Sequence, residues 1–132
     1  MSPDEKAKLR RIIVERGLCG LANDTKWDEF ISAIRQSDGW IPRFRFRCLD
    51  GYVSRWDSEW SYHLPFPFLS VEWFDVESHR DPYPGIQRPP DTTDQSPWLT
   101  TLLDGIGLDY LRGVTSIRIF GYSPRNLDLF DQ

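Results

Sequence analysis

Between residues 50 and 63 the sequence gathers carboxylates, a histidine and aromatic rings in a short stretch. Carboxylates beside an imidazole are groups that bind divalent metals or exchange protons in catalysis. The polar members are Asp50, Asp57, Glu59 and His63, and the rings between them belong to Tyr52, Trp56, Trp60 and Tyr62. This stretch is therefore the first place to look for chemistry.

A strand through this stretch brings Asp57, Glu59 and His63 to one side only if the chain does not bend at Ser58. Elsewhere the sequence has no HExxH or GxSxG spacing, no phosphate-binding glycine loop and no paired CxxC. The common hydrolase, nucleotide-binding and zinc classes therefore lack their required parts. We expect a protein with no cofactor, no metal and no enzymatic activity, and an enzyme built on these three residues stays a third hypothesis.

From residue 43 onward the sequence alternates with a period of two, and Asp50-Gly51 is a strong hairpin signal. This predicts strands at 42–49 and 52–57, in which Arg45 pairs with Trp56. One face of the hairpin then carries Arg43, Arg45, Arg47, Tyr52 and Trp56, and the other buries Phe44, Phe46 and Cys48. The first face either covers the sheet within the monomer or anchors a protein partner.

The charge is divided unevenly along the 132 residues, which carry a formal net charge of −4. Residues 1–48 hold ten Lys or Arg against seven Asp or Glu, and residues 49–132 hold six against thirteen. An acidic second half disfavours general nucleic-acid binding, which depends on neutralising phosphates. It favours a basic protein partner, unless it is simply a solvated acidic surface.

The C-terminal segment 123–132 ends in Asn126-Leu127-Asp128-Leu129-Phe130. These five residues resemble the peptide, ideally Gln-Leu-Asp-Leu-Phe, with which bacterial proteins dock on the DNA polymerase sliding clamp. The resemblance implies that Leu127, Leu129 and Phe130 fill apolar sites on the clamp, with Asn126 in place of the glutamine. The alternative is that these apolar side chains fold back on the core, because exposed Leu and Phe are costly.

Two helices are predicted before the alternating stretch. Ser2-Pro3-Asp4-Glu5 is a helix start, which predicts a helix over 3–16 that ends at Gly17. A second helix, capped by Asp24 or Thr25, buries the face that carries Trp27, Phe30, Ile31 and Ile34, at spacings of i, i+3, i+4 and i+7.

The remaining elements are strands, one helix and a long loop. Alternation predicts strands at 60–64, 69–76 and 115–122, and Ser96-Pro97 begins a helix that runs to about 104. Residues 77–97, with five prolines and no periodicity, form one long loop. The order ααββββαβ predicts a single α+β domain over 1–132, with an antiparallel sheet of about five strands and helices packed on one face.

A wider set of motifs resembles an uncharacterised family of small bacterial proteins. The motifs run from Thr25-Lys26-Trp27 through Leu49-Asp50-Gly51-Tyr52-Val53-Ser54 and Val71-Glu72-Trp73 to Ile119-Phe120-Gly121-Tyr122. The resemblance covers about residues 24–122 and implies a bacterial, cytoplasmic origin, but no activity. Small, acidic, aromatic-rich α+β proteins also occur among the immunity proteins that neutralise bacterial toxins, which is an analogy of type.

We therefore expect a cytoplasmic, non-enzymatic binding protein. No apolar run reaches the roughly 18 residues of a membrane helix, so no membrane contact is expected. The first hypothesis is an immunity protein that covers the active site of its cognate toxin, and the alternative is an accessory protein that docks on the sliding clamp through its tail. The expected partner contacts are Arg45, Tyr52, Trp56, Asp57, Glu59, Trp60 and His63.

Overall fold

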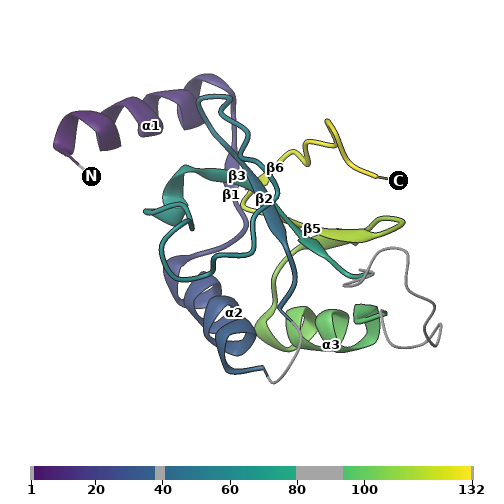
Figure 1. The fold of residues 1–132 in the computed structure, drawn as a ribbon. Helices are drawn as coiled ribbons and strands as arrows, with labels where there is room; N and C mark the ends of the chain where they lie inside the picture. Colours follow the sequence, from purple (N-terminus) through teal and green to yellow (C-terminus); the bar gives the residue numbers. More distant parts are fainter. Residues whose placement is uncertain (1, 38–40, 80–93, 132) are drawn as a thin grey trace.

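The computed structural model describes residues 2–37, 41–79 and 94–131 (Figure 1). Within these residues the helices are α1 (Pro3–Glu15), α2 (Asp24–Gln36) and α3 (Ser96–Ile106), with a 3-10 turn η1 at Phe68–Ser70. The predicted start of α1 is confirmed, because the side chain of Ser2 accepts a hydrogen bond from the backbone of Glu5. The cap of α2 is Asn23, which accepts from the backbone of Lys26, and not Asp24 or Thr25.

The strands form two antiparallel sheets. The larger has the order β2-β3-β5-β4, made of β2 (Phe44–Cys48), β3 (Val71–Glu77), β5 (Ser116–Phe120) and β4 (Tyr110–Arg112). The smaller pairs β1 (Cys19–Gly20) with β6 (Tyr122–Ser123). The α+β class is therefore confirmed, whereas the single five-stranded sheet and the order ααββββαβ are wrong.

Residues 52–57 and 60–64 are not strands. The first segment makes isolated bridges to β2: Phe44 pairs with Asp57 as the predicted register requires, but Arg47 pairs with Val53, one residue out of that register. The second segment coils, because the Asp57 and Glu59 side chains accept hydrogen bonds from backbone N–H groups at Glu59 and Ser61. Side-chain acceptors of this kind compete with strand pairing and favour turns.

The predicted loop at 77–97 falls mostly outside the described residues. Its two ends lie in regular structure, since β3 extends to Glu77 and α3 starts at Ser96. Within the predicted loop, His79 and Asp94 form an isolated bridge, and His79 Nε2 lies 3.2 Å from a carboxylate oxygen of Asp94.

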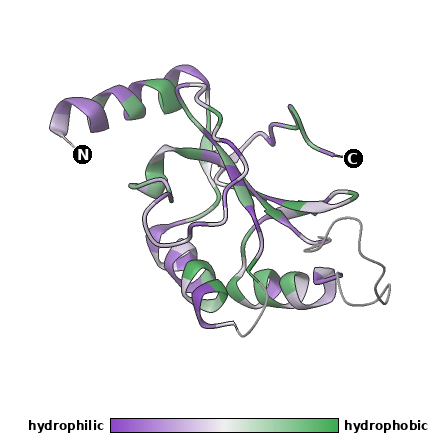
Figure 2. Cartoon of the chain, in the orientation of Figure 1, coloured by the Kyte–Doolittle hydropathy of each residue, from purple (hydrophilic) through white to green (hydrophobic). Residues whose placement is uncertain are grey.

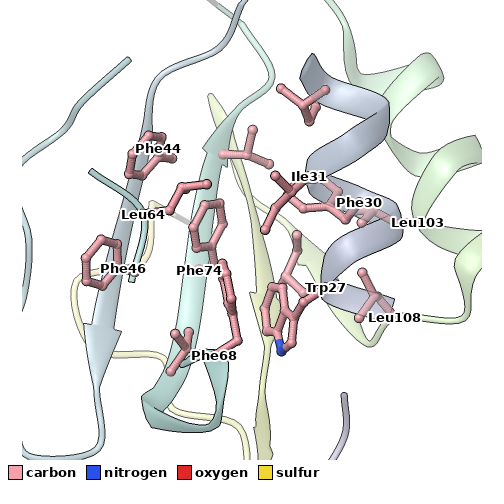
Figure 3. Packing of buried hydrophobic residues seen from close by; sticks show 14 of the residues in the cluster. Trp27, Phe30, Ile31, Phe44, Phe46, Leu64, Phe68, Phe74, Leu103 and Leu108 are labelled. Carbon is pink, nitrogen blue, oxygen red and sulfur yellow. The ribbon is translucent and has the colours of Figure 1, made fainter. Parts of the chain in front are cut away.

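The main core lies between the four-stranded sheet and the pair α2 and α3. Figure 2 shows hydrophobic residues on both helices, and Figure 3 shows Trp27, Phe30 and Ile31 of α2 packed toward Phe74 of β3. The rings of Phe30 and Phe74 meet edge to face at 6.0 Å. As predicted, the α2 stripe is buried, and so are Phe44 and Phe46 of β2, while Cys48 is partly buried. Because strand side chains alternate, the opposite faces of these strands point away from α2 and α3.

Helix α1 packs separately from the other two helices (Figure 1). Its Leu9 belongs to a small second cluster with Leu18, Leu49 and Tyr122, so the prediction of helices on one face holds for α2 and α3. Among the described residues, no helix is both long and apolar enough to cross a membrane.

The side of the large sheet away from α2 and α3, which we call the outer face, is polar and aromatic. Cross-strand pairing places its residues in three rows: Arg43, Glu77 and Ser116; Arg45, Asp75 and Arg118; and Arg47, Trp73 and Phe120. All of the β3 and β5 members of these rows are buried. A sheet face that buries two carboxylates of β3 and an arginine of β5 needs them to be paired.

Candidate protein-binding site

The segment 50–66, which we call the 50–66 loop, runs beside the outer edge of β2. Phe44 and Asp57 exchange both backbone hydrogen bonds, at 2.8 and 2.9 Å, and the Cys48 N–H donates to Tyr52 at 2.8 Å. These contacts cover an edge strand that would otherwise present unpaired backbone groups. The loop is thereby fixed at its start.

Trp60 fixes the other half of the loop. Its side chain is only 5% exposed and packs on Phe30 and Phe44, and its indole N–H donates to the Pro42 carbonyl at 2.8 Å. Arg35 of α2 donates two hydrogen bonds to the Trp60 carbonyl, at 2.6 and 2.9 Å. The sequence predicts Trp60 as a partner contact, and the structure corrects this: the ring belongs to the core because the chain turns it inward.

Asp57 and His63 meet at the surface of this loop. One Asp57 oxygen lies 2.7 Å from Nδ1 of His63, and the other accepts a hydrogen bond from the Glu59 N–H at 2.8 Å. The hydrogen bond from Glu59 lowers the pKa of Asp57, and the contact with His63 lowers it further. Asp57 is therefore a carboxylate at neutral pH and holds the loop's turn.

Glu59 lies next to this pair without joining it. One of its oxygens accepts hydrogen bonds from the backbone of Ser61 at 2.6 Å and of Tyr62 at 3.3 Å. The three residues of the enzyme hypothesis are thus neighbours, but two of them are committed to local turns. Among the described residues, no group of three or more His, Cys, Asp or Glu side chains could hold a metal ion.

A pocket of about 330 Å³ opens beside the Asp57 and His63 pair. Its lining consists of Phe44, Phe46, Tyr52, Ser54, Arg55, Asp57 and His63. The hydroxyl of Ser54 already donates to the Arg55 carbonyl and accepts from the Phe46 N–H. The pocket is therefore an aromatic hollow with polar groups at its rim.

Arg45 and Trp56, two further predicted contacts, interact within the chain. The Arg45 guanidinium donates to Asp75 at 2.9 Å and lies 4.8 Å from the Trp56 ring centre. Arg43 lies 5.9 Å from the same ring and donates to Glu77 at 2.6 and 2.8 Å. The geometry therefore favours the hypothesis that this arginine face covers the sheet within the monomer over the hypothesis that it anchors a partner.

Three aromatic side chains of the loop project into solvent. Tyr52 is 60% exposed, Tyr62 is 88% exposed and Phe66 is 65% exposed. Only Tyr52 is among the predicted contacts. The alternating pattern gave no reason to expect that Tyr62 and Phe66 would be exposed. The turn-forming residues Asp57 and Glu59 were the sequence signal that residues 60–64 would not form a strand.

The predicted clamp residues lie in a tail without helix or strand. Leu127 is 42% exposed and Leu129 is 63% exposed, while the Phe130 ring lies over the guanidinium of Arg118, 4.9 Å from its centre. Asn126 donates from its side-chain amide to Glu72 at 2.9 Å. The two ends of the motif, Asn126 and Phe130, are therefore held by contacts with the sheet, whereas Leu127 and Leu129 are exposed to solvent.

Comparison with known proteins places the chain in a family. A family model described as a family of unknown function, DUF6678, matches residues 9–126. No curated protein and no solved structure matches the chain. The match spans most of the sequence, including β1 to β6 and all of the 50–66 loop, and the chain therefore belongs to the DUF6678 family.

Proposed function

We propose that this protein is a non-enzymatic binding protein whose 50–66 loop docks on a basic surface of another protein. The observation that carries the proposal is the exposure of Tyr52 and Tyr62 on an anchored loop. Its backbone is held by β2 and Arg35, and its Trp60 side chain donates to Pro42. Tyrosine gives a large contact area for the loss of few rotatable bonds. A loop that is already ordered costs less conformational entropy on binding.

The charges next to these rings favour a basic partner. Of the acidic residues in the second half, Glu72, Asp75 and Glu77 are buried and paired with arginines of the same chain. Asp57 and Glu59 instead lie at the surface of the loop. Both accept hydrogen bonds from backbone N–H groups in turns, and Asp57 also contacts His63. The acidic charge that can steer a partner is therefore smaller than the composition indicates, and Asp57 and Glu59 are the part of it that lies on the same loop as Tyr52 and Tyr62.

A bacterial toxin is the partner class that fits best. An enzyme that attacks nucleic acid or nucleotides needs a basic cleft for phosphate, and an acidic loop with aromatic anchors is complementary to such a cleft. The small size, the acidic charge and the type analogy to immunity proteins support the same assignment. In this proposal the loop covers the toxin's active site.

The test is co-expression with a toxin encoded beside the gene. Cells should survive with the intact protein and die without it, and Tyr62→Ala should weaken protection. Val14→Ala is the matched control, because Val14 is 79% exposed on α1 and far from the loop in sequence. Survival that does not change when the gene is deleted would contradict the proposal, and turnover of a small molecule that depends on His63 would support an enzyme instead.

Docking on the sliding clamp is a second candidate, supported by the exposure of Leu127 and Leu129 in an irregular tail. Such docking requires the tail to leave Arg118, which donates to the carbonyls of Asn126 and Asp128. The isolated tail should therefore bind the clamp more tightly than the full chain does.

A further inference from the structure

The C-terminal segment, residues 125–131, lies across the outer face of the large sheet, on the side away from α2 and α3 (Figure 1). The Arg118 guanidinium donates to the carbonyls of Asn126 at 3.0 Å and Asp128 at 2.7 Å. Arg45 donates to the carbonyl of Leu129 at 2.9 Å. The segment is thus held by its backbone, and it turns at Asp128 and Leu129, where the Phe130 N–H donates to the Leu127 carbonyl at 3.2 Å.

Side chains at both ends of the segment complete this attachment: Arg125 donates to Asp109 and Asn126 to Glu72 at one end, and Phe130 and Asp131 make contacts at the other. The Phe130 ring lies 4.9 Å from the Arg118 guanidinium, and the Trp73 ring lies 3.6 Å from the same group, so Arg118 contacts two rings. Asp131 accepts hydrogen bonds from the Thr115 N–H and hydroxyl and from the Ser116 hydroxyl. At the Phe130 end of the segment, an aromatic ring and a carboxylate are therefore the side-chain chemistry that this surface selects.

The outer face carries more positive than negative charge. Five arginines form ion pairs with only three carboxylates. Arg16 and Arg47 pair with Glu72, Arg45 and Arg118 pair with Asp75, and Arg43 pairs with Glu77. Guanidinium groups in excess of carboxylates need other acceptors when they are buried. The carbonyls of the C-terminal segment supply some of them.

Two buried donors on this face make no hydrogen bond to the described residues. They are Nε of Arg47, which lies 3.5 Å from a Glu72 oxygen, and the indole nitrogen of Trp73; the two residues are direct cross-strand partners on β2 and β3. Trp73 is fully buried, and buried donors are normally satisfied. The chain's own segment therefore leaves hydrogen-bonding capacity unused at the end of the face near Asn126, which binds Glu72.

The segment is also loosely packed. Apart from the Phe130 ring and the contact of Arg125 with the Phe120 ring, its described contacts are polar, and Leu127 and Leu129 are exposed. Segments with few buried apolar contacts open at low free-energy cost. The outer face can therefore be uncovered without unfolding the main core.

We propose that the outer face is a second interaction surface, which takes an acidic peptide from a partner protein, and that this peptide carries an aromatic residue. The chain's own C-terminal segment occupies this surface in cis and competes with the partner. Charge complementarity with the surplus arginines selects an acidic peptide, and the rings at Arg118 select the aromatic residue. This surface meets the 50–66 loop at Trp56, whose ring lies against Arg45, but it does not use Tyr52 or Tyr62, on which the first proposal rests. The two proposals are therefore tested with different variants.

The test uses the full-length protein and a fluorescent peptide with the sequence of residues 124–132, followed by fluorescence anisotropy. In the intact chain the bound cis segment reduces the fraction of free surface and so weakens apparent binding. Phe130→Ala loosens the cis segment and should strengthen peptide binding about tenfold. Adding Arg45→Gln to Phe130→Ala should remove most of this gain, whereas Arg10→Gln, an exposed arginine of α1, should leave it unchanged.

Three results would overturn the proposal. One is a folded Phe130→Ala protein, checked by circular dichroism, that binds no peptide at millimolar concentration. Another is equal binding of a peptide of scrambled sequence. The third is a wild-type dimer in light scattering that Phe130→Ala converts to monomer, because the occupant would then be the segment of a second copy.

Discussion

Arg118 and Asp75 form a two-pronged ion pair in which both side chains are completely buried. Nε of Arg118 donates to one Asp75 oxygen at 2.7 Å and Nη2 donates to the other at 3.0 Å. The two residues are direct partners across β5 and β3, so the pair is built into the sheet register. Because Arg118 also holds the C-terminal segment, this pair links the sheet to the tail.

We expect Asp75→Asn to destabilise the fold by about 3 to 5 kcal/mol, since it leaves a buried guanidinium without its anion. Urea denaturation followed by tryptophan fluorescence measures this change. Asp128→Asn is the control, because that side chain is exposed and should change stability by no more than about 0.5 kcal/mol. A loss below about 1 kcal/mol for Asp75→Asn would mean that the pair is solvated in solution.

Phe30→Ala should cost about 3 to 5 kcal/mol, because the ring is fully buried between α2 and the sheet and contacts Trp60 and Phe74. The same denaturation experiment provides the value. Val14→Ala, at an exposed position of α1, should be nearly neutral. If the two variants lost equal stability, α2 would not form the main core.

Stability should fall on acidification through Glu72 and Asp131. Burial by itself raises the pKa of Glu72, but hydrogen bonds from Arg16 and Asn126 outweigh it, so its pKa in the fold lies below the ordinary 4.5. Burial likewise raises the pKa of Asp131, and hydrogen bonds from Ser116 and Thr115 outweigh it, to below the ordinary 3.8.

Because both folded-state pKa values are lowered, the stabilisation is present above the ordinary values and is lost as the pH falls through the folded-state values. The melting temperature should therefore drop below about pH 4.5, and Glu72→Gln should flatten part of that slope. A variant whose melting temperature follows the wild-type curve at every pH would contradict the contribution of Glu72.

For the 50–66 loop, we expect Asp57→Asn with Glu59→Gln to slow association with the basic partner at low salt. These changes remove charge but keep the oxygen acceptors that the turns require. Tyr62→Ala should instead speed dissociation, because its exposed ring is an anchor. Surface plasmon resonance at two salt concentrations separates the effects, and an association rate independent of salt and of both acids would argue against steering.

For the sliding clamp, a peptide of residues 123–132 should bind more tightly than the full chain, and Phe130→Ala should abolish binding of the peptide. The reason is that the full chain must first release its carbonyls from Arg118 and Arg45. Isothermal titration calorimetry of both forms makes the comparison. Absence of peptide binding at high micromolar concentration would end the clamp hypothesis.

The sequence by itself determined the elements whose signals are local. The Ser2 cap placed α1, the spacing of Trp27, Phe30, Ile31 and Ile34 placed the buried face of α2, and alternation placed β2, β3 and β5. It also separated the buried Phe44 and Phe46 from the arginines between them. These signals predict the elements correctly because each depends only on residues a few positions apart in the sequence.

Tertiary structure alone decided which edges pair and which charged groups meet. The choice of β3 as the regular partner of β2, the short strands β1, β4 and β6, and the inward turn of Trp60 depend on contacts between distant residues. The environment of Arg118 also depends on distant residues. The sequence shows it only as one residue of an alternating strand, whereas the structure buries it between Asp75, Trp73 and the tail. A guanidinium is stable without water only when acceptors from separate parts of the chain surround it, and no local pattern encodes that arrangement.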